Sequence, residues 1–118
     1  MEYKTGNVTV MVSDFERAVS FYTQVLGFTL KNRYGNEWAD VSAPGVNIGL
    51  HPDGGNARAR GAALSIGFEV SSLDQAMQEL RNKGVEFPQG VRDAGHLREA
   101  AFSDPDGTPL YLVEIKGG

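Results

Sequence analysis

The sequence predicts an α+β fold of two similar modules, each ordered strand, helix, strand, strand, strand. A pattern of strand, turn and amphipathic helix occurs twice, about 58 residues apart, starting near Val8 and near Ile66. Each predicted helix ends at a glycine, Gly27 or Gly84, which an apolar–polar–apolar triplet follows. A repeat of this kind indicates two modules that share one core, with any binding site near the axis relating them.

Composition restricts the class of protein. The 118 residues suffice for one domain with a substantial core. Cysteine is absent, which excludes disulfides, thiolate metal sites and a thiol nucleophile. The net charge of -4 argues against a nucleic-acid-binding surface, and no apolar stretch approaches the roughly 20 residues that span a bilayer. We therefore expect a cytoplasmic protein with no nucleic-acid and no membrane partner.

Module one is predicted over residues 5–51. Residues 7–12 alternate in polarity, as a half-buried strand does. Ser13 and Glu16 match a capping box, which predicts that a helix starts there. Helical spacing gives that helix one apolar stripe, made of Phe15, Ala18, Val19, Tyr22 and Leu26. Turn signals then separate three expected strands, at residues 28–34, 37–41 and 46–51.

A polar, glycine-rich segment, P-D-G-G-N-A-R-A-R-G at residues 52–61, is predicted to be a linker. The same order restarts in module two, at residues 62–116, with alternation from Leu64 to Val70. Ser72 and Gln75 form the second candidate capping box. The last three strands are expected at residues 85–87, 98–102 and 110–115. The prediction is therefore one domain over residues 1–118.

Alternation also predicts which side chains face the helices. The strand positions expected there are Ala39, Val41, Ile48, Leu50, Ala100, Phe102, Leu110 and Leu112. The opposite face is polar and aromatic, and no helix remains to cover it. We expect the sheets to curl this face around a shared cavity, where small-molecule sites tend to lie.

Two segments carry a family resemblance: D-F-E-R-A-V-S-F-Y-T-Q-V-L-G-F at residues 14–28 and F-S-D-P-D-G-T-P-L-Y-L-V-E at residues 102–114. Together with the paired modules, they resemble the vicinal-oxygen-chelate superfamily over nearly the whole chain. That superfamily includes glyoxalase I, extradiol dioxygenases, and fosfomycin- and bleomycin-resistance proteins. The resemblance implies an incomplete barrel around a cavity, commonly in a homodimer. It does not imply one chemistry, because this fold hosts many.

The resemblance also marks the positions of a metal site. The metalloenzymes of the family hold one divalent ion with His- and Glu-type side chains near the start of each module's first strand and on each fourth strand. Those positions correspond here to Asn7, Gly49, Ser65 and Tyr111. None of them supplies an imidazole or a carboxylate. We therefore expect no metal and no cofactor.

The predicted ligand-binding residues are Asn7, Met11, Trp38, His51, Ser65, Glu99 and Tyr111. Trp38 and Tyr111 are interpreted as aromatic walls, although single aromatic residues on strands are also common in cores. His51 and Glu99 are interpreted as polar contacts, with solvated strand-end positions as the alternative. His51, His96 and Glu99 have the residue types of a metal site, but no spacing supports one.

These expectations favour a metal-independent protein that binds a small organic molecule, with drug sequestration as the nearest family precedent. The first alternative is a lyase, isomerase or dioxygenase that uses an off-pattern metal or no metal, with His51 or Glu99 as a base. The second is a structural or regulatory domain whose own side chains fill the cavity. Catalytic residues stay unassigned, since no G-x-S-x-G, G-x-G-x-x-G or P-loop motif occurs.

Overall fold

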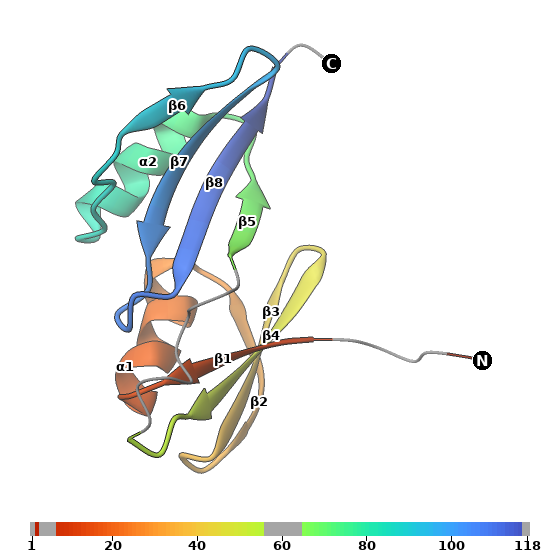
Figure 1. Cartoon of the computed structure of the whole chain (residues 1–118). Helices are drawn as coiled ribbons and strands as arrows, with labels where there is room; N and C mark the ends of the chain where they lie inside the picture. The colour runs from red at the N-terminus through yellow and green to blue at the C-terminus, as the bar shows by residue number, and fades with distance from the viewer. Residues whose placement is uncertain (1, 3–6, 56–64, 117–118) are drawn as a thin grey trace. The chain divides into compact units, whose positions relative to one another are not determined.

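The computed structural model describes residue 2 and residues 7–55 and 65–116, and it confirms two similar modules. The contacts divide the chain into two compact units, residues 1–62 and 63–118, which we call module one and module two. Each contains a four-stranded mixed sheet with helical structure packed on it (Figure 1). Residues 56–61 of the predicted linker lie outside the described part of the chain.

The two sheets have the same strand order, with the first strand of each module parallel to its last strand. Module one contains β1 (Val8–Val12), α1 (Phe15–Ser20), η1 (Phe21–Val25), β2 (Thr29–Tyr34), β3 (Trp38–Ala43) and β4 (Val46–Pro52), in the sheet order β1-β4-β3-β2. Module two contains β5 (Ile66–Glu69), α2 (Leu73–Asn82), β6 (Val91–Asp93), β7 (Leu97–Ser103) and β8 (Pro109–Ile115), in the order β5-β8-β7-β6.

The buried face of each sheet is the predicted one. All eight strand residues expected to face the helices are buried, with Ile48 and Leu50 fully inaccessible to solvent. On the helices the most buried side chains include Tyr22 and Leu73. Full burial of one aliphatic side chain, such as Ile48, Leu50 or Leu73, stabilises a fold by about 1.5–3 kcal/mol. These buried faces therefore hold the helices in place.

The first helix differs from the prediction at its start and in the form of its last turn. Asp14, and not Ser13, is its N-cap, and the Asp14 carboxylate accepts a hydrogen bond from the Arg17 amide at 3.1 Å. The capping-box prediction was therefore wrong by one residue, because the helix begins one position later. Beyond Ser20 the helix widens into the π-helical segment η1, where the Leu26 amide bonds to the Phe21 carbonyl.

The prediction of a strand at residues 85–87 is also wrong. That segment is irregular, and the edge strand β6 forms a few residues later. Val85 and Phe87 are nevertheless buried, and the Phe87 ring packs against Phe102 with the centroids 5.5 Å apart. Their alternation therefore reflects burial in the core and not pairing with a neighbouring strand.

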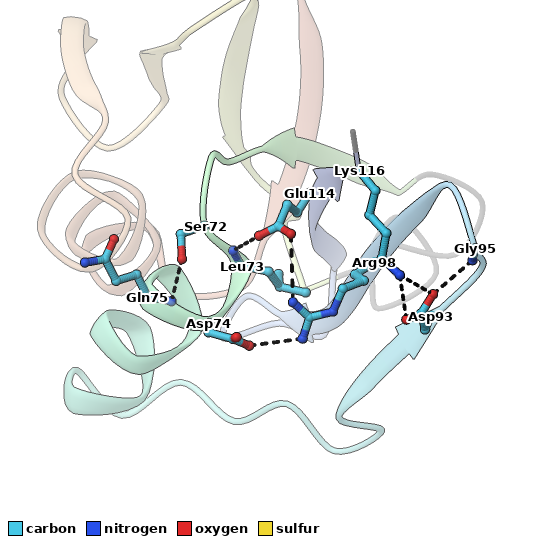
Figure 2. Close-up of polar contacts among 9 residues, drawn as sticks. All are labelled: Ser72, Leu73, Asp74, Gln75, Asp93, Gly95, Arg98, Glu114 and Lys116. Carbon is cyan, nitrogen blue, oxygen red and sulfur yellow. Dashed lines mark hydrogen bonds and ion pairs between the residues drawn. The ribbon is translucent and has the colours of Figure 1, made fainter. Parts of the chain in front are cut away.

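The N-terminus of α2 is tied to its sheet by hydrogen bonds (Figure 2). Ser72 caps the helix as predicted, accepting from the Gln75 amide at 3.3 Å. Glu114, on β8, accepts from the Leu73 amide at 2.7 Å. Two of the amide groups that a helix start leaves unpaired are thereby satisfied, one of them by a residue far away in sequence.

Ion pairs extend this cluster along the sheet (Figure 2). Arg98 reaches Asp74 on the helix at 3.1 Å and Glu114 at 3.8 Å, and the bond to Asp74 is the main cause of a raised Arg98 pKa. At the edge, Lys116 contacts Asp93 at 2.7 Å. Within the described residues, neither module has a helix long and apolar enough to cross a membrane.

Candidate functional site

Strand register arranges the helix-free face of module one in rows. Met11 pairs with His51, and Trp38 pairs with Tyr34. Trp38 and His51 meet edge-to-face, with ring centroids 6.2 Å apart. One row across the sheet therefore contains the thioether of Met11 and the rings of His51, Trp38 and Tyr34. Tyr34, at the end of the row, is 63% exposed.

The indole of Trp38 lies over the backbone of Gly49 on the neighbouring strand. A Cβ atom built at Gly49 would sit 2.2 Å from Cη2 of the indole, a distance that no real side chain tolerates. The indole Nε1 donates to Oδ1 of Asp40 at 2.8 Å. Trp38 is half-buried in this position. Glycine below and a carboxylate at the edge thus fix the orientation of the ring.

The imidazole of His51 has a defined hydrogen-bonding role. Its Nδ1 lies 2.6 Å from the carbonyl oxygen of Pro52. A carbonyl oxygen only accepts, so the proton of the neutral ring belongs on Nδ1. Nε2 then carries the lone pair and serves as an acceptor.

Module two has the same rows with different chemistry. The row that corresponds to the aromatic one contains Glu69, Val113, Glu99 and Arg92. In the next row, the ring of Tyr111 lies over Gly67, where an added Cβ would fall 2.1 Å from Cζ of the tyrosine. An aromatic ring over a glycine therefore occurs in each module.

A cavity of about 470 Å³ lies on this helix-free side of module two. Its wall includes three predicted site residues, Ser65, Glu99 and Tyr111, together with Arg92. Arg92 donates to the Glu99 carboxylate at 2.6 Å, so the predicted polar contact is an ion pair. Volumes of 300–1,000 Å³ are typical of small-molecule sites.

The predicted site residues fall into separate groups. Ser65, Glu99 and Tyr111 share the cavity of module two, and Met11, Trp38 and His51 share the aromatic row of module one. Asn7 lies apart from that row, at a hollow of about 550 Å³ that Ser42 and Asn47 also line. That these residues bind a ligand stays a prediction.

Sequence reasoning missed two residues at these sites. Tyr34 reaches the aromatic row because a β-bulge between Leu30 and Asn32 shifts the register of β2, and nothing in the local pattern marks that bulge. Arg92 was missed because the edge strand was expected earlier. Arg92 lies opposite Glu99 and is the cationic member of a complementary charge pair. This position can be assigned only once β6 is placed.

The residues at the family's metal positions do not fit a divalent ion. Gly49 offers no side chain, and the indole fills the space that a carboxylate there would need. The other positions carry an amide, a hydroxyl and a phenol, which are poor substitutes for imidazole and carboxylate ligands. Among the described residues, no three His, Asp or Glu side chains form a group that could hold a metal, so a set of His51, His96 and Glu99 lacks support.

Comparison with known proteins agrees with the family resemblance of the sequence. A family model described as the Glyoxalase/Bleomycin resistance protein/Dioxygenase superfamily matches residues 4–112. The uncharacterised protein YwkD of Bacillus subtilis is 32% identical over 92% of this chain and 94% of its own length. The mitochondrial methylmalonyl-CoA epimerase of Homo sapiens is 25% identical, covering 96% of this chain and 73% of that protein. The crystal structure of TnmS3, an antibiotic-binding protein from Streptomyces sp. CB03234, superimposes with a TM-score of 0.72 at 26% identity, covering 98% of this chain and all of that one.

Proposed function

The chain belongs to the glyoxalase/bleomycin resistance protein/dioxygenase superfamily, and on that basis we propose that it binds a small organic molecule without using a metal ion. The observation that carries this proposal is the cavity of about 470 Å³ in module two. Its lining combines the aromatic residues Tyr111 and Phe102 with hydroxyl, carboxylate and guanidinium groups. Small-molecule sites usually combine an apolar wall with a few placed polar groups, and this cavity has a larger share of polar groups than that.

The cavity residues have distinct proposed roles. Tyr111 forms an aromatic wall, and the backbone of Gly67 supports its ring from behind. Ser65 offers a hydroxyl that can donate or accept. Glu99 and Arg92 form an ion pair at the cavity, so a ligand there meets a carboxylate and a guanidinium side by side.

Sequestration of a drug-like molecule is the form of binding that we favour. The similarity to a protein described as antibiotic-binding supports this class of ligand. The metal positions support a mechanism without chelation, because Gly49 and the indole above it leave no room for a carboxylate ligand. Binding then depends on stacking and hydrogen bonds.

The test is a screen of aromatic and amine-bearing compounds, bleomycin-type antibiotics included, by thermal shift and calorimetry. We expect at least one saturable ligand. Loss of one stacking ring is worth about 1–3 kcal/mol, so Tyr111→Ala should weaken that ligand ~10- to 100-fold. Glu79→Gln, an exposed change on α2, is the control and should leave affinity unchanged. A screen without any saturable ligand would favour the structural or regulatory alternative.

An enzymatic function is the second candidate, and one observation favours it. The tautomer of His51 leaves Nε2 free to accept a proton, as a general base must. The similarity to an epimerase identifies methylmalonyl-CoA as a first substrate to assay. If the metal-free protein catalyses epimerisation and His51→Gln abolishes that activity, catalysis replaces sequestration as the proposed function. Epimerisation only after divalent metal is added would contradict the proposed metal independence.

We also propose that the protein acts as a cytoplasmic homodimer. Open four-stranded sheets leave edge strands that another copy can cover. Light scattering at micromolar concentration should give twice the 12.7 kDa mass of one chain. A stable particle of one chain's mass would contradict the dimer.

A further inference from the structure

The geometry points to one ligand class for module one: a planar aromatic molecule with a hydrogen-bond donor at its edge, stacked on Trp38 and donating to Nε2 of His51. This inference rests on the proposed small-molecule binding and names the chemistry that the aromatic row selects. Its three supports are the fixed indole, the tautomer of the histidine and the exposed ring at the end of the row.

The indole is held as a rigid platform. Gly49 lets the ring approach the backbone so closely that an added Cβ would be 2.2 Å from it. Asp40 holds the indole Nε1 at 2.8 Å, so rotation of the ring breaks a partly buried hydrogen bond. A ring ordered before binding loses less entropy when a ligand stacks on it. Asp40 is therefore a positioning residue for Trp38.

The histidine beside the platform selects a donor. Its Nδ1–H is directed to the Pro52 carbonyl, so Nε2 of the neutral ring offers only an acceptor. The imidazole lies beside the indole of Trp38, with the ring centroids 6.2 Å apart and an interplanar angle of 68°. A phenolic O–H or a heteroaromatic N–H on the ligand matches that acceptor, and an ether oxygen does not.

Tyr34 extends the row on the other side of Trp38. The two residues are paired across β2 and β3, and Tyr34 is 63% exposed. An exposed ring next to a fixed one suits a ligand longer than a single aromatic ring. A fused bicyclic compound is thus a better probe than a phenol.

The test compares naphthol with its methyl ether, which has the same rings but no donor. Both are titrated by calorimetry and by quenching of Trp38, the only tryptophan in the chain. We expect naphthol to bind about ten-fold more tightly, because it gains a hydrogen bond to Nε2 of His51 that the ether cannot donate. His51→Ala should remove that preference, so that naphthol and its ether bind equally. His96→Ala, a change at the other histidine, is the matched control and should preserve it.

The platform is tested through Asp40. Asp40→Ala should weaken both compounds several-fold and change the near-ultraviolet circular dichroism of Trp38. Asp40→Asn should restore both properties, because an amide oxygen also accepts from the indole N–H. A merely structural role would instead lower the melting temperature without this rescue pattern in the Trp38 signal.

Several results would overturn the inference. They are equal affinity for naphthol and its ether, failure of both to bind, and equal effects of His51→Ala and His96→Ala. Failure of the inference is distinguishable from failure of the proposed function. If library ligands bind and respond to Tyr111→Ala but not to Trp38→Ala, the small-molecule proposal stands and the naphthol-type site in module one is wrong.

Discussion

The two modules are alike on the face that touches the helices and differ on the face that does not. Their sheets have the same strand order, and the predicted core positions are buried in both. On the helix-free face, the same row contains Met11, His51, Trp38 and Tyr34 in module one and Glu69, Val113, Glu99 and Arg92 in module two. One row is aromatic, and the other is charged.

A second contrast concerns the ring that lies over a glycine. In module one the ring belongs to Trp38 on β3 and covers Gly49 on β4. In module two it belongs to Tyr111 on β8 and covers Gly67 on β5. The same contact is thus made from a different strand in each half. Close packing restricts the buried face, where one methylene matters, while the helix-free face is free to diverge.

The largest expected effect tests the likeness of the buried faces. Ile48 and Leu110 are counterparts in the repeat, and both are almost completely buried. We expect Ile48→Ala and Leu110→Ala each to lower the free energy of unfolding by about 2–5 kcal/mol, because each leaves a cavity in a packed core. Urea unfolding measures this. A loss below about 1 kcal/mol at either site would mean that the two cores are not equivalent.

An intermediate effect is expected where the rings meet the glycines. Gly49→Ala and Gly67→Ala each place a Cβ within about 2.2 Å of a ring atom, which forces the ring to move. Overpacking of this kind costs about 1–3 kcal/mol, measurable by urea unfolding.

Only Gly49→Ala should also shift the emission of Trp38. Combining it with Trp38→Ala should remove most of its cost, since the clash is then absent. Additive costs in that double variant would show that the indole is not what restricts position 49.

The smallest effect concerns pH and belongs to module two. The hydrogen bond to Lys116, and secondly the Gly95 amide, lower the pKa of Asp93 below its usual value of 3.8. The contact therefore contributes its stability at neutral pH and loses it as the pH falls below about 3.8.

Asp93→Asn should reduce the difference in unfolding free energy between pH 7 and pH 3, measured by urea titration at both values. Glu86→Gln, at an exposed position, is the control and should leave that difference closer to the original. An unchanged difference in Asp93→Asn would mean that the contact with Lys116 contributes nothing measurable to folding.

The local sequence pattern predicted most helices and strands, but it did not indicate which segments pair with each other in the sheets. The alternation of Ile48 and Leu50 with polar residues predicted the correct buried face. The same reasoning failed at Val85 and Phe87, which alternate and are buried without belonging to a strand. Alternation reports burial, and strand pairing needs a partner that lies elsewhere in the chain.

In the candidate sites, too, the local pattern predicted which face a side chain is on, but strand pairing decided which side chains meet. Trp38 and Tyr111 were identified from parity alone, and both lie on the helix-free face. Tyr34 has the same parity as Leu30, yet the bulge between them puts Tyr34 next to Trp38, while Leu30 pairs with Val41 on the buried face. A single extra residue reverses which face a strand presents, and its position depends on pairing with β3.

The sequence by itself determined the repeat, the helix ends at Gly27 and Gly84, and the buried faces of both sheets, because these depend on local conformation and on periodicity. Only the tertiary structure decided that an indole fills the space above Gly49 and that Arg92 meets Glu99. Those contacts join residues on different strands. Register and bulges set them, and both arise from non-local pairing that no single segment encodes.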